Sequence, residues 1–301
     1  MSEKVIKSYK AFDNNMQCRG FQYEVGKEYE MDGEIKCCDR GFHACKSPIE
    51  VWGYYDMLSS RFAEVEQYGK IDEEESSTKV CSSHIKIKAE LKLADIINVG
   101  VEWLKDITSP KKVKTDIAKN DNGGDSAKIG SSGDYAKIGS SGDYAKIGSS
   151  GDYAQIGSSG NYAKIGSSGE SAQIGSSGDY AKIGSSGDSA KIGSSGDSAK
   201  IGSSGDYAQI GSSGDYAKIG SSGDSAKIYS TGEDSVIMCA GKESKAKAKV
   251  GSWITLTEWE WNDDKRRRVP LCVKTEYVDG NNIKADTWYQ LKNGKFVEVT
   301  K

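Results

Sequence analysis

The chain has 301 residues and a formal net charge of −3, so bulk charge favours neither a polyanion nor a membrane surface as a partner. No apolar stretch reaches transmembrane length, and the opening MSEKVIKSYK holds no apolar run that could act as a signal peptide. Seven cysteines form an odd set without framework spacing, which favours a reduced, cytoplasmic setting.

Residues 1–110 read as an α+β domain. KVIKSYKAF and FQYEVGKEYEM predict strands, and HIKIKAEL alternates apolar and charged residues as a half-buried strand does. SPIE predicts a capping box before a short helix, with Ser47 as the N-cap and Glu50 reaching back. LADIINVGVEWL predicts a helix, and TSPKKVKTD (108–116) predicts a polar connector.

Residues 116–250 repeat one nonapeptide, G-S-S-G-D-(Y/S)-A-(K/Q)-I, with Ile in unbroken phase and Ala two residues before it. A disordered linker has no use for an aliphatic residue in fixed phase. The pattern therefore predicts a β-solenoid in which Ala and Ile share the inward side of a short strand. We expect GSSGD to form the corner, with Gly at positive φ, and the varying Tyr/Ser and Lys/Gln positions to face water.

The number of units in one coil is either two or three. Gln replaces Lys only in alternate units, which favours two, whereas some replacements of Tyr by Ser recur three units apart, which favours three. We favour two. Because open strand edges invite further pairing, the array needs caps, and the flanking domains are expected to supply them.

Residues 251–301 predict a small antiparallel β meander that caps the array, with KNGK as a tight hairpin. Four tryptophans are expected to supply its core: Trp253, Trp259, Trp261 and Trp288. The predicted fold class is therefore mainly β, with a central β-solenoid flanked by an N-terminal α+β domain and this C-terminal meander.

The predicted partner-binding residues lie on the outer surface of the repeat and in one loop. Tyr with Ser and Gly makes an adaptable recognition surface, although the tyrosines could instead stack and shield the strand backbone. The loop is the run KRRR in a predicted hairpin tip, for which the alternative is a solvated turn. The predicted residues are Tyr135, Tyr144, Tyr153, Tyr162, Tyr180, Tyr207, Tyr216, Arg266, Arg267 and Arg268.

Metal and cofactor sites are not predicted. CCDRGFHAC brings Cys37, Cys38, His43 and Cys45 close together but holds no C-x-x-C pair, so buried thiols are favoured over zinc. The unit lacks the G-G-x-G of calcium-binding rolls, and its Asp is expected to close an Asx turn or pair with Lys.

His43 is the one catalytic candidate, with a packed or hydrogen-bonded histidine as the favoured alternative. The sequence shows no Ser-His-Asp order, P-loop or nucleotide fingerprint. These observations favour a protein that is not an enzyme.

Several motifs resemble a group of uncharacterised phage and prophage proteins: CRGFQYEVGKEYE (18–30), RGFHAC (40–45), IGSSGDYAKI and GSWITLTEWEW. That group shares an N-terminal domain of unknown function, nonapeptide repeats and a closing aromatic segment. The resemblance implies a bacterial host cytoplasm and a mobile-element origin, and it transfers no activity and no catalytic residue. By analogy with small phage accessory proteins, we expect an interaction protein whose capped solenoid binds a host macromolecule and inhibits a defence or nucleic-acid-processing system.

Two alternatives stay open. RGFHAC before a capped helix is similar to the strand–helix junction of ADP-ribosyltransferase-like folds, which would make His43 part of an enzyme acting on a nucleotide-like substrate. A filament or virion component is the other. A host protein is the expected partner, nucleic acid is less favoured, no membrane contact is expected, and a homodimer is compatible with the pattern.

Overall fold

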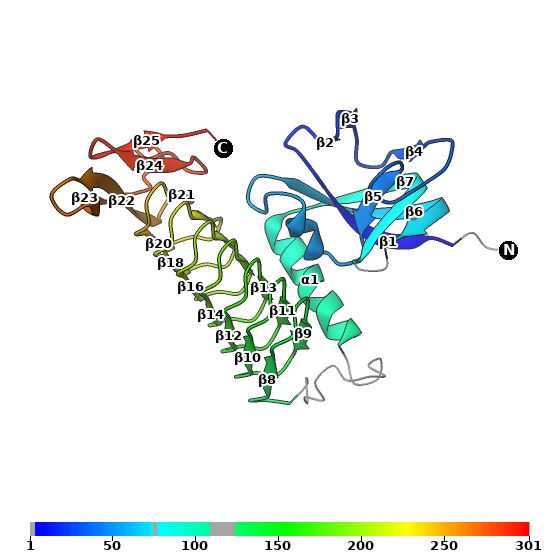
Figure 1. Cartoon of the computed structure of the whole chain (residues 1–301), viewed down its shortest axis with the longest axis horizontal. Coiled ribbons are helices and arrows are strands. Elements are labelled where there is room, and N and C mark those ends of the chain that lie inside the picture. The colour runs from blue at the N-terminus through cyan, green and yellow to red at the C-terminus, as the bar shows by residue number, and fades with distance from the viewer. Residues whose placement is uncertain (1–3, 75–76, 109–123, 301) are drawn as a thin grey trace. The chain divides into compact units, whose positions relative to one another are not determined.

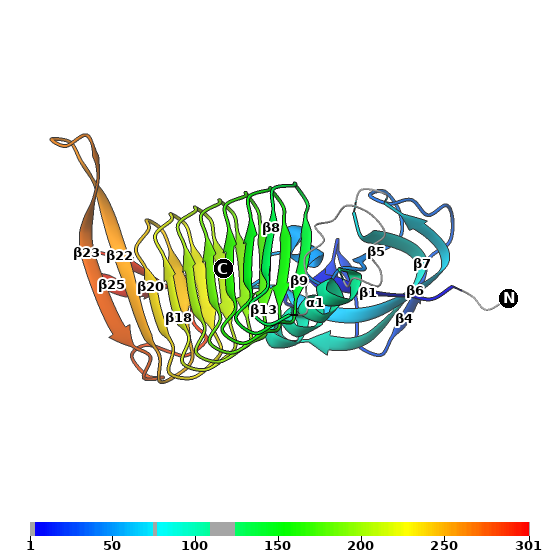
Figure 2. The ribbon, with the colours of Figure 1, turned by 90° about the horizontal axis from the view of Figure 1, so that it is seen from below.

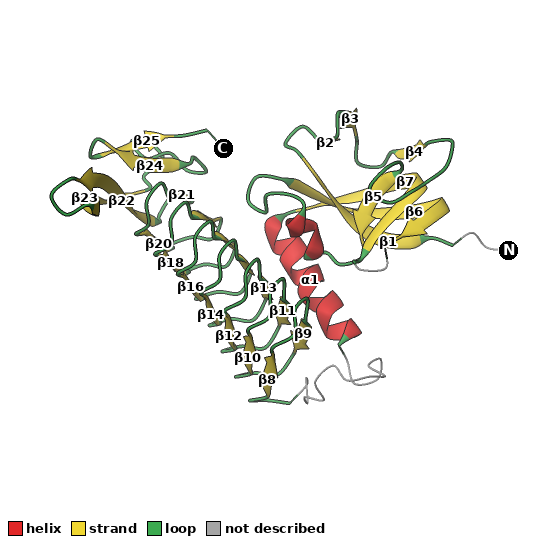
Figure 3. Cartoon of the chain, in the orientation of Figure 1, coloured by secondary structure: helices red, strands yellow, loops and turns green. Residues whose placement is uncertain are grey.

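The computed structural model describes residues 4–74, 77–108 and 124–300 (Figure 1). The chain divides into two compact units, Met1–Trp103 and Leu104–Lys301. The predicted fold class is confirmed, because strands dominate both units and the repeat forms a solenoid (Figure 3). The predicted connector beyond residue 108 and the first repeat residues, 116–123, lie outside the described residues.

The N-terminal unit is built on a five-stranded antiparallel sheet with the strand order β4-β7-β5-β1-β6. Because β6 also pairs with β7, the sheet closes into a barrel of four strands, β7, β5, β1 and β6. The strands β2 and β3 form a separate two-stranded hairpin. Its strands are β1 (Ile6–Phe12), β2 (Gln17–Cys18), β3 (Phe21–Gln22), β4 (Glu28–Glu30), β5 (Phe42–Cys45), β6 (Arg61–Glu73) and β7 (Lys79–Leu91). The helix α1 (Leu93–Ile107) follows and runs across the boundary between the two units.

The predicted short helix is a 3-10 turn, η1 (Glu50–Gly53). The predicted N-cap is wrong, because the turn has Ile49 as its N-cap and Ile49 forms no side-chain cap hydrogen bond. The Ser47 hydroxyl still accepts a hydrogen bond from the Glu50 N–H at 3.3 Å. The Glu50 carboxylate instead accepts the Thr78 N–H at 3.0 Å. The reciprocal half of the predicted capping box is therefore wrong, since the start of β7 offers the carboxylate another donor.

The solenoid consists of two parallel sheets whose strands alternate along the chain (Figure 2). Ile147 pairs with Ile165 in one sheet, and Ile156 pairs with Ile174 in the other. Each coil therefore contains two units, as favoured, and the three-unit alternative is wrong. The first sheet contains β8 (Lys128–Ser131), β10 (Lys146–Ser149), β12 (Lys164–Ser167), β14 (Lys182–Ser185), β16 (Lys200–Ser203), β18 (Lys218–Ser221) and β20 (Val236–Cys239). The second contains β9 (Lys137–Ser140), β11 (Gln155–Ser158), β13 (Gln173–Ser176), β15 (Lys191–Ser194), β17 (Gln209–Ser212), β19 (Lys227–Ser230) and β21 (Lys245–Lys247).

The solenoid interior holds columns of Ala, Ile and Ser. The predicted burial of Ala and Ile is confirmed, with Ala163 and Ile174 both at 0% exposure. The strands from β8 to β18 read Lys/Gln-Ile-Gly-Ser, so the period of two also turns the first Ser of the unit inward. The sequence reasoning missed this serine. Its hydroxyl has no hydrogen-bond partner among the described residues at Ser140, Ser149, Ser158, Ser167, Ser176, Ser185, Ser194, Ser203, Ser212 and Ser221.

The corners differ from the prediction in which residue takes positive φ. The Tyr/Ser position does so, as at Tyr162 (φ 57°), and no described repeat glycine does. The Asn161 N–H donates to Asp143 Oδ1 in the preceding coil, whereas the Tyr162 N–H donates to the Asp179 carbonyl of the following coil. Successive N–H groups thus bond to the preceding and the following coil, and the chain takes its left-handed conformation at Tyr162, directly after them.

The corner glycine is needed for close approach. A Cβ added at Gly160 would overlap the backbone carbonyl of Gly142 in the preceding coil, and every corner glycine from Gly142 to Gly241 shows the same overlap. The predicted role of Gly in supplying positive φ is therefore wrong. Gly is required because adjacent coils touch backbone to backbone.

The C-terminal strands extend the solenoid sheets and form no separate sheet of their own. β22 (Trp253–Asn262) adds to β20 in parallel, and β23 (Arg267–Tyr277) then closes the first sheet antiparallel to β22. In the second sheet, β24 (Tyr289–Lys292) adds to β21 antiparallel, and β25 (Lys295–Glu298) then closes the sheet antiparallel to β24. The predicted C-terminal cap is thus present as two hairpins, one on each sheet.

The predicted tryptophan core is wrong for two of its four members. Ile254 pairs with Ile237 and continues the inward isoleucine column, so Trp253 must point outward, where it is 47% exposed. Trp261 is 56% exposed, Trp259 is half-buried and Trp288 is buried. Within the described ranges, no helix is both long and apolar enough to cross a membrane.

Candidate functional site

The predicted tyrosines lie on the two corners of the solenoid, and they do not share a strand face. Tyr144, Tyr162 and Tyr180 stack on one corner, with ring centroids 5.0 and 4.9 Å apart and planes within 6°. Tyr135 and Tyr153 stack in the same way on the other corner, at 5.1 Å. All seven predicted tyrosines are exposed, including Tyr207 and Tyr216. Five of the seven therefore stack on one another and still expose part of their surface to solvent.

The repeat Asp joins neighbouring coils. Asp143 Oδ1 accepts the Asn161 N–H at 2.7 Å, and Asn161 Oδ1 in turn accepts the Asp179 N–H at 2.8 Å. The same bond recurs along both corners over an 18-residue separation. The expected Asx turn or Lys pair is therefore not the main contact of this side chain. An amide oxygen serves as well as a carboxylate, which explains why Asn can replace Asp.

Lysine forms an in-register column on the outer face of the first sheet. Lys146 pairs with Lys164 and Lys164 with Lys182, and the whole column is exposed. Within the described chain, no carboxylate forms an ion pair with any member. A column of glycines with open space above them runs beside the lysines and leaves a shallow groove. We call the column of lysines the lysine ladder; it consists of Lys128, Lys146, Lys164, Lys182, Lys200 and Lys218.

In the second sheet, the positions that correspond to the lysine ladder hold both Lys and Gln. Gln155 and Gln173 are register neighbours there and are 6% and 8% exposed, so the prediction that Lys/Gln faces water fails at these two positions. The two sheets of the solenoid therefore present different outer faces. The difference is visible in the sequence, since Gln occurs only in units of the second sheet.

The lysine ladder ends in an apolar patch. Val236 takes the position after Lys218, and Trp253 and Tyr277 follow in register. The Trp253 and Tyr277 rings are 5.1 Å apart. Met238 and Val273 are also exposed, at 54% and 59%. Sequence reasoning missed this patch, although the signal was present: Val236 and Met238 replace Lys and Gly at outward positions of the repeat.

The predicted arginines lie at the tip of the β22–β23 hairpin (Figure 2). Arg266 has φ 47° in the turn, and Arg267 and Arg268 begin β23 opposite Asn262 and Trp261. All three are exposed. They are therefore available to a partner but stand on the projecting hairpin, outside the lysine ladder.

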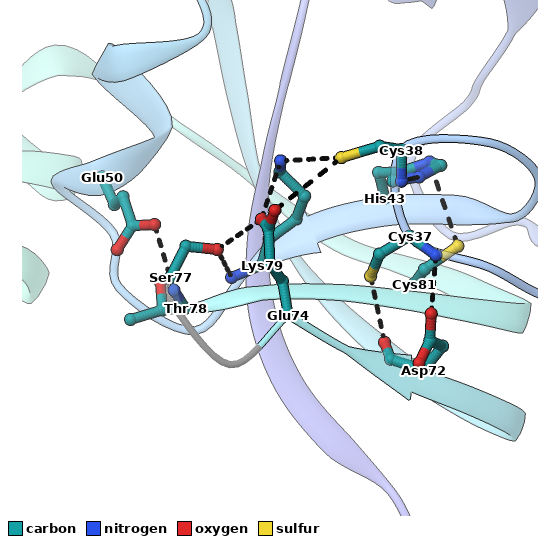
Figure 4. A network of polar contacts seen from close by, with 10 residues as sticks. All are labelled: Cys37, Cys38, His43, Glu50, Asp72, Glu74, Ser77, Thr78, Lys79 and Cys81. Atoms are coloured by element: carbon teal, nitrogen blue, oxygen red, sulfur yellow. Dashed lines mark hydrogen bonds and ion pairs between the residues drawn. The ribbon is translucent and has the colours of Figure 1, made fainter.

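His43 lies on β5 in a network of polar contacts (Figure 4). The Cys38 N–H donates to His43 Nε2 at 3.0 Å, so this nitrogen is already used as an acceptor. Burial, followed by the positive charges of Lys10 and Arg19, lowers the pKa of His43. A neutral ring held by a backbone donor favours the structural alternative over a catalytic role.

The cysteines of this region have separate partners. Cys37 Sγ donates to the Asp72 carbonyl at 3.3 Å (Figure 4). Cys81 Sγ donates to the Arg40 carbonyl at 3.1 Å. Burial raises the pKa of Cys45 to about 12, so its thiol stays protonated at neutral pH. Over the described ranges, no three His, Cys, Asp or Glu side chains gather as a metal site would require.

A pocket of about 370 Å³ opens in the N-terminal unit among β1, the β2–β3 hairpin, β5 and the η1 region. Its lining combines aromatic rings with the buried Lys10 and the exposed Arg19. Sequence reasoning missed this site apart from His43. The residues lie far apart in the chain, and no local motif connects them.

Fold and surfaces together define a two-sheet β-solenoid protein with an appended N-terminal α+β domain. Residues 6–99 match the family described as "Domain of unknown function (DUF7666)", so the chain carries a DUF7666 domain at this position. No curated protein and no solved structure matches the chain.

Proposed function

We propose that the protein is a non-enzymatic interaction protein that binds an acidic protein surface through the outer face of its first solenoid sheet. The observation that carries this proposal is the lysine ladder continuing into the apolar patch of Val236, Met238, Trp253, Val273 and Tyr277. Interface cores favour Trp, Tyr and Met, and a rim of charge sets the orientation of the partner.

Electrostatics support an acidic partner. Register neighbours in a sheet are about 4.8 Å apart, so adjacent lysines repel one another by up to about 1 kcal/mol in water before salt screening. The ladder holds no ion pair within the described residues that would offset this repulsion. A partner that places its carboxylates along the groove would offset the repulsion between the lysines.

A protein partner is favoured over nucleic acid for two reasons. Acidic corner residues, such as Asp143 and Asp179, stand three residues before every ladder lysine except Lys164 and would repel a continuous phosphate backbone. The stacked rings of Tyr144, Tyr162 and Tyr180 contact each other at about 5 Å, which leaves no room for bases between them. The tyrosine edges instead supply contact area beside the ladder.

The resemblance to phage and prophage proteins supports a host protein in the bacterial cytoplasm as the partner, with a defence or nucleic-acid-processing protein as the class to examine first. The capped C-terminal end supports a discrete particle over a filament, since β23 and β25 close both sheets there.

The experiment begins with capture of partners from bacterial lysate on the immobilised full chain, followed by mass spectrometry. The partner is then purified and titrated against the wild type and a triple variant, Lys146→Gln, Lys164→Gln and Lys182→Gln. We expect binding to weaken at least tenfold with unchanged circular dichroism, because the charges that orient the partner are gone. A second variant, Trp253→Ser, tests the apolar patch.

The matched control lies on the other corner. Tyr135→Ser with Tyr153→Ser removes a stacked tyrosine pair away from the ladder and should leave binding unchanged, whereas Tyr144→Ser with Tyr162→Ser should weaken it. Equal effects of the two pairs, or full binding by the triple lysine variant, would reject this face. Tight, salt-dependent binding of single-stranded DNA by the wild type would reject the protein-partner assignment.

A further inference from the structure

The pocket of the N-terminal unit contains a buried cation. Lys10 is 4% exposed, and its Nζ donates to the His43 carbonyl at 2.8 Å and lies 3.4 Å from Cys18 Sγ. It also stands over the rings of Phe12 and Tyr23, at 5.6 and 5.3 Å from their centroids. In the described part of the chain, no carboxylate reaches it within ion-pair distance.

This environment favours a negatively charged ligand. An ammonium group has three donors, and a carbonyl, a thiol and ring faces balance its charge only in part. Burial lowers the pKa of Lys10, so the charged form is costly in the free protein. An anion beside the nitrogen would restore the charged form.

A second cation stands at the rim of the same pocket. Arg19 and Gly20 form the turn between β2 and β3, with φ of 51° and 78°, which matches the two left-handed residues of a tight hairpin. The Arg19 guanidinium forms no hydrogen bond or ion pair within the described ranges. The hairpin thus holds a free cation at the pocket mouth.

Few negative charges in the pocket lining offset these two cations. Lys79 also lines the pocket, but its Nζ pairs with Glu74 at 3.0 Å. Asp39 is the one carboxylate among the lining residues, and it is exposed. The inner part of the pocket therefore presents positive charge.

The walls are aromatic and carry neutral hydroxyls. Phe21 and Tyr23 meet edge to face at 4.8 Å, and the Tyr55 hydroxyl lies 2.8 Å from Cys18 Sγ. Burial raises the pKa of both Tyr23 and Tyr55, so the phenols stay protonated and available as donors. Such walls accept a planar ring.

We propose that the DUF7666 domain binds a small aromatic compound carrying a single oxyanion, with the anion between Lys10 and Arg19 and the ring against Phe21 and Tyr23. The volume of about 370 Å³ suits a ligand of one to three rings. This site is independent of the solenoid face, so either proposal can fail alone.

The test is a fluorescence titration of the full chain with 8-anilinonaphthalene-1-sulfonate, an aromatic anion, and with its uncharged analogue N-phenyl-1-naphthylamine. We expect one site per chain that prefers the sulfonate. Lys10→Met keeps the length and burial of the side chain but removes its charge, and should weaken sulfonate binding by about tenfold to a hundredfold while leaving the uncharged probe unchanged. Displacement by benzoate and by phenyl phosphate then distinguishes a carboxylate ligand from a phosphate ligand.

Two further variants keep the test decisive. Arg19→Asn removes the rim cation with a residue that tolerates positive φ, and should also weaken the sulfonate even if Lys10→Met does not fold. Lys7→Met removes an exposed lysine from the same strand, paired with Glu64 at 2.8 Å, and should change nothing. Equal binding of both probes by the wild type, or sulfonate binding that survives Arg19→Asn but is lost in the triple lysine-ladder variant, would overturn the proposal.

Discussion

Replacement of a corner glycine by alanine should break the contact between adjacent coils. A Cβ at Gly160 would overlap the Gly142 carbonyl and lie 3.0 Å from the Asp143 nitrogen. Backbone atoms on both sides cannot rotate away as a side chain would, so the two coils must separate locally. Gly160→Ala therefore tests the claim that the repeat glycine serves close stacking.

The cost follows from the bonds that such separation would stretch. The Ser159 N–H donates to the Ser140 carbonyl at 3.0 Å, and the Asn161 N–H donates to the Asp143 carboxylate at 2.7 Å. A neutral hydrogen bond contributes about 0.5–1.5 kcal/mol and one to a charged group about 1.5–3 kcal/mol. Loss of both predicts a fall of about 2–4.5 kcal/mol in the free energy of unfolding, a large share of the roughly 5–15 kcal/mol typical of a domain.

The matched control is Gly166→Ala in β12 of the same coil. Gly166 lacks positive φ, and a Cβ there would meet nothing within 4 Å. This change should be neutral or stabilise by about 0.4–1 kcal/mol, since alanine restricts the unfolded chain. Urea denaturation gives both free energies, and hydrogen exchange of coils 137–180 locates the effect. Equal stability of the two variants would refute the close-stacking account.

Three further predictions concern single positions of the repeat, each measured as a change in the free energy of unfolding. Ser189 sits at φ 57°, so Ser189→Val should destabilise by about 1–2 kcal/mol while Ser189→Asn stays near wild type; equal effects would refute a conformational cause. Asp179 Oδ1 accepts the Asp197 N–H at 2.8 Å, so Asp179→Ala should cost about 1–3 kcal/mol and Asp179→Asn much less. An equal loss in both variants would show that the negative charge, and not only the acceptor oxygen, is needed. Ser176→Ala removes a buried hydroxyl without a described partner and should be neutral or stabilising, whereas a loss above about 1 kcal/mol would show that the hydroxyl is bonded in solution.

The solenoid could be predicted because burial leaves a direct trace in sequence. Ile in fixed phase with Ala two residues earlier has one economical explanation, a column of packed side chains. The coil size was also encoded, since Gln155, Gln173 and Gln209 all belong to the second sheet. The buried serine was not predicted, because a polar residue beside glycine is typical of a turn.

The corner conformation could not be read from residue type. Glycine at a corner indicates either positive φ or close approach, and sequence alone does not separate the two. Tyrosine has no preference for the left-handed region, yet Tyr162 adopts it at a corner where its N–H donates to the Asp179 carbonyl in the next coil. Contacts between coils thus override local preference.

The pocket of the N-terminal unit was beyond sequence reasoning for a different reason. Lys10 lies on β1, Arg19 in the turn between β2 and β3, and Tyr55 just after η1. The fold alone brings these three residues to one cavity. His43 drew attention through its neighbours in RGFHAC, but its carbonyl, as the acceptor of Lys10, contributes more directly to the pocket than its ring.

The end of the first sheet carries the strongest physical sign of a partner. At this end of the sheet, the inward positions Ile237 and Ile254 are apolar and fully buried, so they already supply the core that holds the coils together. The stability of the solenoid therefore does not require apolar residues on the outer face as well. Val236, Trp253 and Tyr277 are nevertheless exposed, and each square ångström of apolar surface left in water forgoes about 25 cal/mol. A face that joins this patch to a ladder of unpaired lysines has a surface chemistry that the solenoid does not need for its own stability. A protein partner that covers both at once accounts for it.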